Sequence, residues 1–150
     1  MWGTALAALG AVGAAPPAGA GVPEADLAYH GSAAMAGGLM DVALTPRNHG
    51  PSAVPEAAVR LRWSAPLAER QPEPAPGCVR TGLREVVCRT GALPADGVGE
   101  RIELVVRLAG RPAEARLEIE TVWGGGRVDR DVDNDRQRVL VLDTGDRYYF

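Results

Sequence analysis

Three segments alternate apolar and charged side chains with a period of two, and this pattern constrains the fold more than any other feature of the chain. The segments span residues 57–64, 101–108 and 115–123. Such alternation is typical of β-strands that bury one face and expose the other. We therefore expect their apolar faces to share one core, formed by Val59, Leu61 and Trp63, by Ile102, Leu104, Val106 and Leu108, and by Leu117, Ile119 and Trp123.

Further strands are expected at 26–29, at 39–46 and at 137–142. The last of these is apolar throughout its centre, as a strand buried on both faces would be. The proline-rich segment 71–77 can form neither a helix nor a central strand. About seven or eight short strands separated by turn signals predict an all-β fold, an antiparallel immunoglobulin-like β-sandwich.

The two cysteines, Cys78 and Cys88, flank a segment that reads as a β-hairpin with its turn at Thr81-Gly82. Opposed hairpin residues are close enough for a disulfide, which would contribute about 2–3 kcal/mol by constraining the unfolded chain. Free thiols are the first alternative. A metal site or a reactive thiol has less support, because neither histidine is near the cysteines in sequence.

Residues 1–20 have the composition of a signal peptide. The uncharged apolar stretch from Thr4 to Ala15 is too short for a membrane span, and Ala18-Gly19-Ala20 fits a signal peptidase site. No Arg or Lys precedes the stretch, which indicates either an atypical signal or a true start upstream of Met1. A disordered Ala/Gly/Pro-rich leader on a cytosolic protein is the alternative. We expect a secreted chain, with the cell wall as one destination. Its single domain would span 21–150, with a core at about 25–142, an aromatic tail at 143–150 and no membrane span.

Charge gives no reason to expect nucleic acid as a partner. The formal net charge is -3, and all sixteen basic residues are arginine. The arginines are scattered along the chain, so compositional drift explains them better than recognition of phosphate or carboxylate groups.

Three groups of residues are candidate sites. Asn48, Gly50 and Pro51 are expected to build a tight turn, in which Asn tolerates and Gly supplies a positive φ; a ligand-binding loop is the alternative. The carboxylates of Asp129, Asp131, Asp133 and Asp135 could hold Ca²⁺, although the EF-hand pattern fails and a solvated loop is the simpler interpretation. The aromatic residues Tyr148, Tyr149 and Phe150 either pack on the sandwich or form an exposed patch that binds a partner.

Several of these motifs together resemble a known family. They are Asn48-x-Gly50-Pro51-Ser52, the pair Cys78 and Cys88, Gly91-x-Leu93, and Gly124-Gly125 with Asp131-x-x-Asn134-Asp135 before Val139-x-Val141. Over about residues 25–142 the chain resembles the bacterial extracellular immunoglobulin-like surface repeat, a domain of unknown function. It is also similar to single-domain secreted proteins of actinobacteria. The resemblance implies an adhesion or cell-wall module, but this chain has one copy, no anchor, and Asn134-Asp135 where the family commonly has two asparagines.

We expect a non-catalytic exported binding or structural module. Its partner would be cell-wall material or an exported protein, and it would need no cofactor. The alternative is a Ca²⁺- or carbohydrate-binding domain that uses the acidic loop 129–135. The sequence contains no motif of a hydrolase or metalloprotease, so we do not expect an enzyme.

Overall fold

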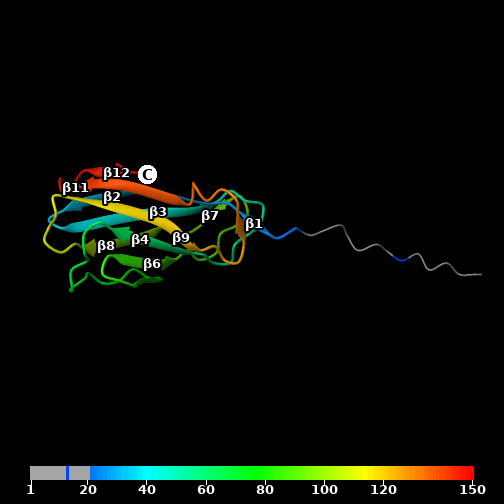
Figure 1. Cartoon of the computed structure of the whole chain (residues 1–150), viewed down its shortest axis with the longest axis horizontal. Coiled ribbons are helices and arrows are strands. Elements are labelled where there is room, and N and C mark those ends of the chain that lie inside the picture. Colours follow the sequence, from blue (N-terminus) through cyan, green and yellow to red (C-terminus); the bar gives the residue numbers. More distant parts are fainter. Residues whose placement is uncertain (1–12, 14–20) are drawn as a thin grey trace, which may run out of the picture.

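The strands of this protein form two sheets that face each other, together with a small separate pair (Figure 1). The structure, a computed structural model, describes residue 13 and residues 21–150. Its strands are β1 (Glu24–Ala25), β2 (Leu27–Ala36), β3 (Leu39–Asn48), β4 (Ala58–Trp63), β5 (Cys78–Arg80), β6 (Glu85–Arg89), β7 (Gly97–Val98), β8 (Ile102–Arg107), β9 (Glu114–Trp123), β10 (Val128–Asp129), β11 (Arg136–Leu142) and β12 (Arg147–Tyr149). Seven strands in this described part have five or more residues.

The order of the strands confirms the expected sandwich. One sheet has the order β12-β2-β3, with β8 and β7 both pairing with β3, and the other has the order β11-β9-β4-β6-β5. The chain crosses between the sheets after β3, after β6, after β8 and after β11. These crossings between antiparallel strands are the Greek-key connections of an immunoglobulin-like sandwich. The predicted signal peptide lies outside the described residues, apart from Gly13.

No helix long and apolar enough to cross a membrane occurs in residue 13 or residues 21–150.

The inward faces of the two sheets form the main core, as the alternation predicted. The predicted apolar positions of β4 and β8 are buried, and so are Leu117 and Ile119 on β9. They pack against buried side chains of β2 and β3 in one cluster. Trp63 is fully buried in this core and donates its indole N–H to the sulfur of Met40, 3.2 Å away. Each such buried side chain contributes about 1.5–3 kcal/mol relative to an exposed one.

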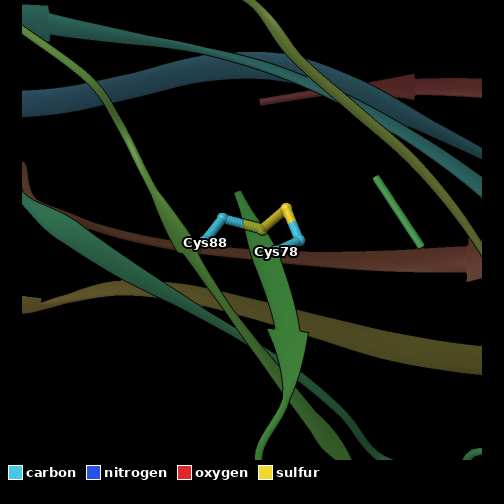
Figure 2. Close-up of a disulfide and its surroundings, with 2 residues drawn as sticks. All are labelled: Cys78 and Cys88. Carbon is cyan, nitrogen blue, oxygen red and sulfur yellow. A yellow bond between two sulfur atoms is a disulfide. The ribbon is translucent and has the colours of Figure 1, made fainter. Parts of the chain in front are cut away.

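The two cysteines form the predicted disulfide (Figure 2). Cys78 on β5 lies directly opposite Cys88 on β6, and the S–S distance is 2.06 Å. Both residues are buried in the main core. The disulfide therefore closes the short β5–β6 hairpin and ties the edge strand β5 to the sheet.

The first long strand extends well beyond the predicted segment 26–29. β2 runs from Leu27 to Ala36 and pairs along its whole length with β3. Most residues that follow Tyr29 in β2 are small, so the hydrophobic contrast that marks a half-buried strand is weak there. Pairing with β3 on one side and β12 on the other makes this segment a strand.

The turn at Asn48 exists, but the predicted reason for its residues was wrong. Neither Asn48 nor Gly50 has a positive φ. A Cβ on Gly50 would lie 2.5 Å from the Cα of Ala25, so glycine is needed there for close approach of two chain segments. The buried Asn48 side chain accepts hydrogen bonds from the amides of Asp26 and Gly50 and donates to the carbonyls of Ser52 and Pro94. Asn48 thus joins three separate segments at this end of the sandwich.

Trp123 is not in the core, contrary to the prediction. It is 53% exposed, because the pairing of β9 with β4 shifts by one residue between Ala58 and Val59. Val59 lies opposite Thr121, whereas Ala58 lies opposite Trp123. Ala58 lies two residues before the outward-facing Arg60, so it also faces outward. Opposed residues share a face of the sheet, so Trp123 faces outward with Ala58. The bulge therefore moves Trp123 to the outer face.

The last long strand is also less buried than predicted. β11 lies at the edge of its sheet and pairs with β9 alone among the described strands. Val141 faces the core, whereas Leu140 lies opposite the exposed Arg116 and is 52% exposed. An apolar sequence at a sheet edge can thus imitate a central strand.

We expect the double substitution Cys78→Ala with Cys88→Ala to lower the free energy of unfolding by about 2–3 kcal/mol, since the short closed loop no longer restricts the unfolded chain. Urea denaturation of the variant and of the wild type measures this loss. Reduction of the wild type with dithiothreitol should give a similar decrease. Equal midpoints for all three samples would contradict a stabilising disulfide.

We expect Asn48→Ala to lower the free energy of unfolding by about 2–4 kcal/mol, because it removes the acceptor of two amides in a closely packed corner. Asn134→Ala is the matched control. Asn134 makes one side-chain hydrogen bond, to Asp26, so its loss should cost only about 1 kcal/mol. Urea denaturation measures both, and an equal effect of the two substitutions would show that Asn48 is not a structural centre.

Candidate functional site

An open groove crosses the outer face of the sheet that contains β2 and β3. Its volume is about 990 Å³, at the upper end of the range of small-molecule sites, about 300–1,000 Å³. Its lining comes from four neighbouring strands and from the proline-rich segment, and includes His30, Ser32, Asp41, Ala43, Glu103, Arg147 and Tyr149. We call this feature the sheet groove.

The sheet groove is hollow at its centre because the outward side chains there are small. The strand register places Tyr149, Ser32, Ala43 and Glu103 in one row across β12, β2, β3 and β8. Ser32 and Ala43 are buried, although they point away from the core. Large side chains at both ends of the row and small ones in the middle leave a hollow.

The C-terminal tail forms one wall of the sheet groove. Phe150 and Gly31 exchange two backbone hydrogen bonds of 3.0 Å, next to the pairing of β12 with β2. Tyr148 and Phe150 pack against the core, whereas Tyr149 is 78% exposed. Two residues of the tail therefore pack on the sandwich, and the third is exposed. The binding of a partner by the tail stays a prediction.

The proline-rich segment forms the opposite wall. Pro72, Glu73 and Ala75 line the groove there. The side-chain amide of Gln71 holds this segment in place, because it accepts from the backbone N–H of Arg107 and donates to its carbonyl, both at 2.9 Å. The amide thus takes the place of a neighbouring strand along the edge of β8.

Four charged side chains in the sheet groove form two ion pairs. Arg147 lies 3.8 Å from a carboxylate oxygen of Asp41 and also donates to the hydroxyl of Ser32. Arg101 contacts Glu103 at 2.8 Å. Because these groups are partly exposed, the pairs add little to stability. They do fix the positions of these groups, since one pair reaches from β12 to Asp41 on β3 and the other lies at Glu103 on β8.

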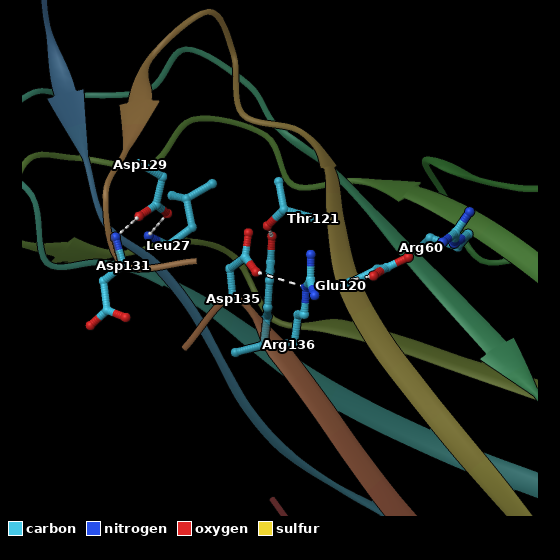
Figure 3. Close-up of polar contacts among 9 residues, drawn as sticks. Leu27, Arg60, Glu120, Thr121, Asp129, Asp131, Asp135 and Arg136 are labelled. Carbon is cyan, nitrogen blue, oxygen red and sulfur yellow. Dashed lines mark hydrogen bonds and ion pairs between the residues drawn. The ribbon is translucent and has the colours of Figure 1, made fainter. Parts of the chain in front are cut away.

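The acidic loop 129–135 serves mainly to connect chain segments (Figure 3). One carboxylate oxygen of Asp129 accepts the backbone N–H of Leu27, and the other accepts that of Asp131. These bonds hold the loop beside β2, where β1 and β10 also pair. Arg130 adds an ion pair of 2.6 Å with Glu24.

Asp135 is buried beside the core and close to Asp129. Burial raises the pKa of the Asp135 carboxyl above its ordinary value, and the charge of Asp129 raises it further, while the Thr121 hydroxyl and Arg136 oppose the shift. The Tyr29 hydroxyl lies 2.7 Å from Thr121 Oγ1 in the same region. Burial raises the pKa of Tyr29 to about 12, so this group stays neutral well above physiological pH.

The structure does not gather the four proposed calcium ligands. Asp135 is buried, whereas Asp131 and Asp133 are exposed, and Asp129 already accepts two backbone amides. Within residue 13 and residues 21–150, no group of three or more His, Cys, Asp or Glu side chains is arranged to hold a metal ion. Calcium binding by this loop stays a prediction.

Several residues of the sheet groove were not found by sequence reasoning. Asp41 and Glu103 lie at outward positions of predicted strands, and this alternation was the one available signal. His30 and Ser32 were missed because the predicted first strand ended at residue 29.

Three arginines that are distant in sequence also lie together, on the other sheet. Arg62, Arg84 and Arg116 line a separate hollow of about 450 Å³ there.

Comparison with known proteins does not assign the chain to a family. No family model matches it, and no curated protein matches it. A solved structure, that of β-glucosidase 3B from Thermotoga neapolitana in complex with α-D-glucose, is similar over 84% of this chain and 17% of that chain, with 14% identity and a TM-score of 0.47. The resemblance to the extracellular surface repeat therefore stays a prediction.

We expect Asp135→Asn to stabilise the protein at neutral pH. A raised pKa means that the folded state favours the protonated carboxyl of Asp135. The stability that the protonated carboxyl contributes is fully present below the pKa of the unfolded state, and it is lost as the pH rises through the raised pKa of the folded state. The amide keeps the size of the side chain without the buried charge. Urea denaturation between acidic and neutral pH should show an advantage over wild type that grows with pH.

The exposed Asp133 provides the control for this prediction. Asp133→Asn removes one charge from the same loop without changing a buried group, so its stability difference from wild type should stay small over the same pH range. An Asp135→Asn variant that is less stable than wild type at neutral pH would show that the ionised carboxylate is needed for the fold.

Proposed function

We propose that this protein is a non-catalytic, exported binding module that holds cell-wall material or an exported protein in the sheet groove. The observation that carries the proposal is the position of the tail. Pairing of β12 with β2 places the exposed Tyr149 along the side of a large open groove. Exposed aromatic side chains beside a concave surface are common anchors of binding sites.

The construction of the groove supports binding by a preformed surface. Its floor consists of paired strands, and its two walls are held by backbone pairing of the tail and by Gln71. A surface that is already ordered loses little conformational entropy when a ligand binds. The carboxylates of Asp41 and Glu103 each face an arginine, which favours a role in hydrogen bonding to a ligand over a role in catalysis.

The disulfide supports export. Disulfides persist in oxidising compartments and are rare in the cytosol, and Cys78–Cys88 is a buried disulfide within the core. Secretion, possession of a signal peptide and association with the cell wall are all parts of this proposal.

We expect residues 21–150, which include every described strand, to sediment with cell walls isolated from the source organism. Tyr149→Ala should weaken this binding about tenfold or more, because the substitution removes the exposed aromatic anchor. Trp123→Ala is the matched control, since Trp123 is exposed on the other sheet and does not line the groove. Sedimentation with and without Ca²⁺ also tests the acidic loop.

Equal binding by Tyr149→Ala and the wild type would show that the sheet groove is not the contact surface. Absence of binding both to walls and to exported proteins of the source organism would overturn the proposed function. An increase of binding in Ca²⁺ that Asp131→Asn abolishes would favour the calcium-binding alternative.

A further inference from the structure

We propose that the ligand of the sheet groove is a neutral, hydroxyl-rich glycan chain. This inference rests on the proposed function, because it takes the groove to be the contact surface. It adds the chemical class of the ligand and the side chains that would select it, which are Asp41, Glu103, Arg147 and Tyr149.

The charge of the lining favours a ligand without charge. Three carboxylates, those of Asp41, Glu73 and Glu103, line the groove together with the guanidinium groups of Arg101 and Arg147. Two of the carboxylates already pair with an arginine. An anionic polymer would have to compete with these carboxylates for the arginines, and a cationic one would have to compete with the arginines for two of the three carboxylates. A neutral ligand disrupts neither pair.

The paired groups keep hydrogen-bonding capacity that suits hydroxyl groups. A guanidinium has five N–H donors and a carboxylate has about four acceptor positions, so one ion pair leaves most of them free. The side chain of Thr45 lies on the groove floor near Arg101 and Glu103, while the hydroxyl of the buried Ser32 accepts from Arg147. Donors and acceptors therefore alternate over a short distance. A sugar hydroxyl, which both donates and accepts, can satisfy either kind.

The centre of the floor carries only small side chains, while the larger apolar side chains of the lining, such as Val105 and Phe150, lie on β8 and beside β12. The central side chains of the floor are those of Ser32, Ala43 and Thr45, which are all small. The flat and narrow floor suits a ring-shaped ligand that lies against it.

Tyr149 supplies a highly exposed aromatic contact beside the floor. Its ring stands free on one wall, while its backbone is held in β12 between Tyr148 and Phe150, which both pack on the core. An aromatic face is apolar and carries partial negative charge, which suits the C–H face of a sugar ring. Because the backbone is held, little further ordering is needed when the sugar binds.

The dimensions favour a polymer segment over a single sugar. Tyr149 and Glu103 lie in one row on strands that are three spacings apart, which corresponds to about 14 Å across the sheet. The hollow is open to solvent. A chain of sugar rings can lie in it, with Tyr149 and Arg147 on the β12 side and the Arg101–Glu103 pair on the β8 side.

Calorimetry and wall sedimentation together test this inference. The probes are chitopentaose, cellopentaose, the anionic polymer polygalacturonate, and walls treated with protease and acid to remove proteins and phosphate-bearing polymers. We expect binding to the treated walls and to at least one neutral oligosaccharide. We also expect this binding to persist at high salt, because a neutral ligand has no charge to be screened.

Two substitutions in the groove have matched controls on the other sheet. Tyr149→Ala should weaken binding about tenfold or more, whereas Trp123→Ala should not change it. Arg147→Ala should also weaken binding, while Arg138→Ala should not. Arg138 is likewise an exposed arginine that pairs with a carboxylate, at 3.3 Å from Glu118. Equal thermal midpoints of all four variants would show that the fold is retained.

The outcomes separate this inference from the proposed function. If untreated walls bind but the treated walls and both oligosaccharides do not, the glycan inference is overturned and the proposed function stands. The glycan inference is also overturned if high salt abolishes the binding, or if polygalacturonate displaces the ligand. If untreated walls and exported proteins both fail to bind, the proposed function fails as well.

Discussion

The pairing of β2 with β3 is the constraint on which the rest of this structure depends. The ten paired positions give one face to the core and the other to the sheet groove. Inward side chains such as Tyr29 and Met40 are large and buried, whereas the outward Ser32 and Ala43 are small. One strand pair thus supports the hydrophobic core with one face and leaves a hollow on the other, because successive residues of a strand point to opposite faces.

Polar side chains join the ends of this strand pair to segments that are distant in sequence. Asn48 binds backbone groups of three segments, and Asp129 accepts the amide of Leu27. Buried polar groups are costly unless they are hydrogen-bonded, so these bonds select one arrangement of the loops. Gln71 and the tail act similarly beside the groove. The candidate binding surface is therefore built from parts that are also needed for the fold.

The accuracy of the sequence predictions followed the strength of the local signal. β4 and β8 alternate strongly and were predicted almost to the residue, and the opposed cysteines were predicted from the length of their hairpin. Trp123 was misplaced because a bulge depends on the partner strand, which the alternation of β9 does not reveal. The groove was not predicted, because it arises from the register of four strands and the second of them, β2, has weak contrast.

The sequence by itself determined the fold class, the inward residues of the strongly alternating strands and the disulfide, since each depends on spacing within a short segment. The tertiary structure alone decided that Tyr149 stands beside Ser32, that Asp41 pairs with Arg147 and that the acidic residues of 129–135 separate into buried and exposed groups. The first two relations join residues more than a hundred positions apart. Strand register and burial set them, and both depend on the whole chain being folded.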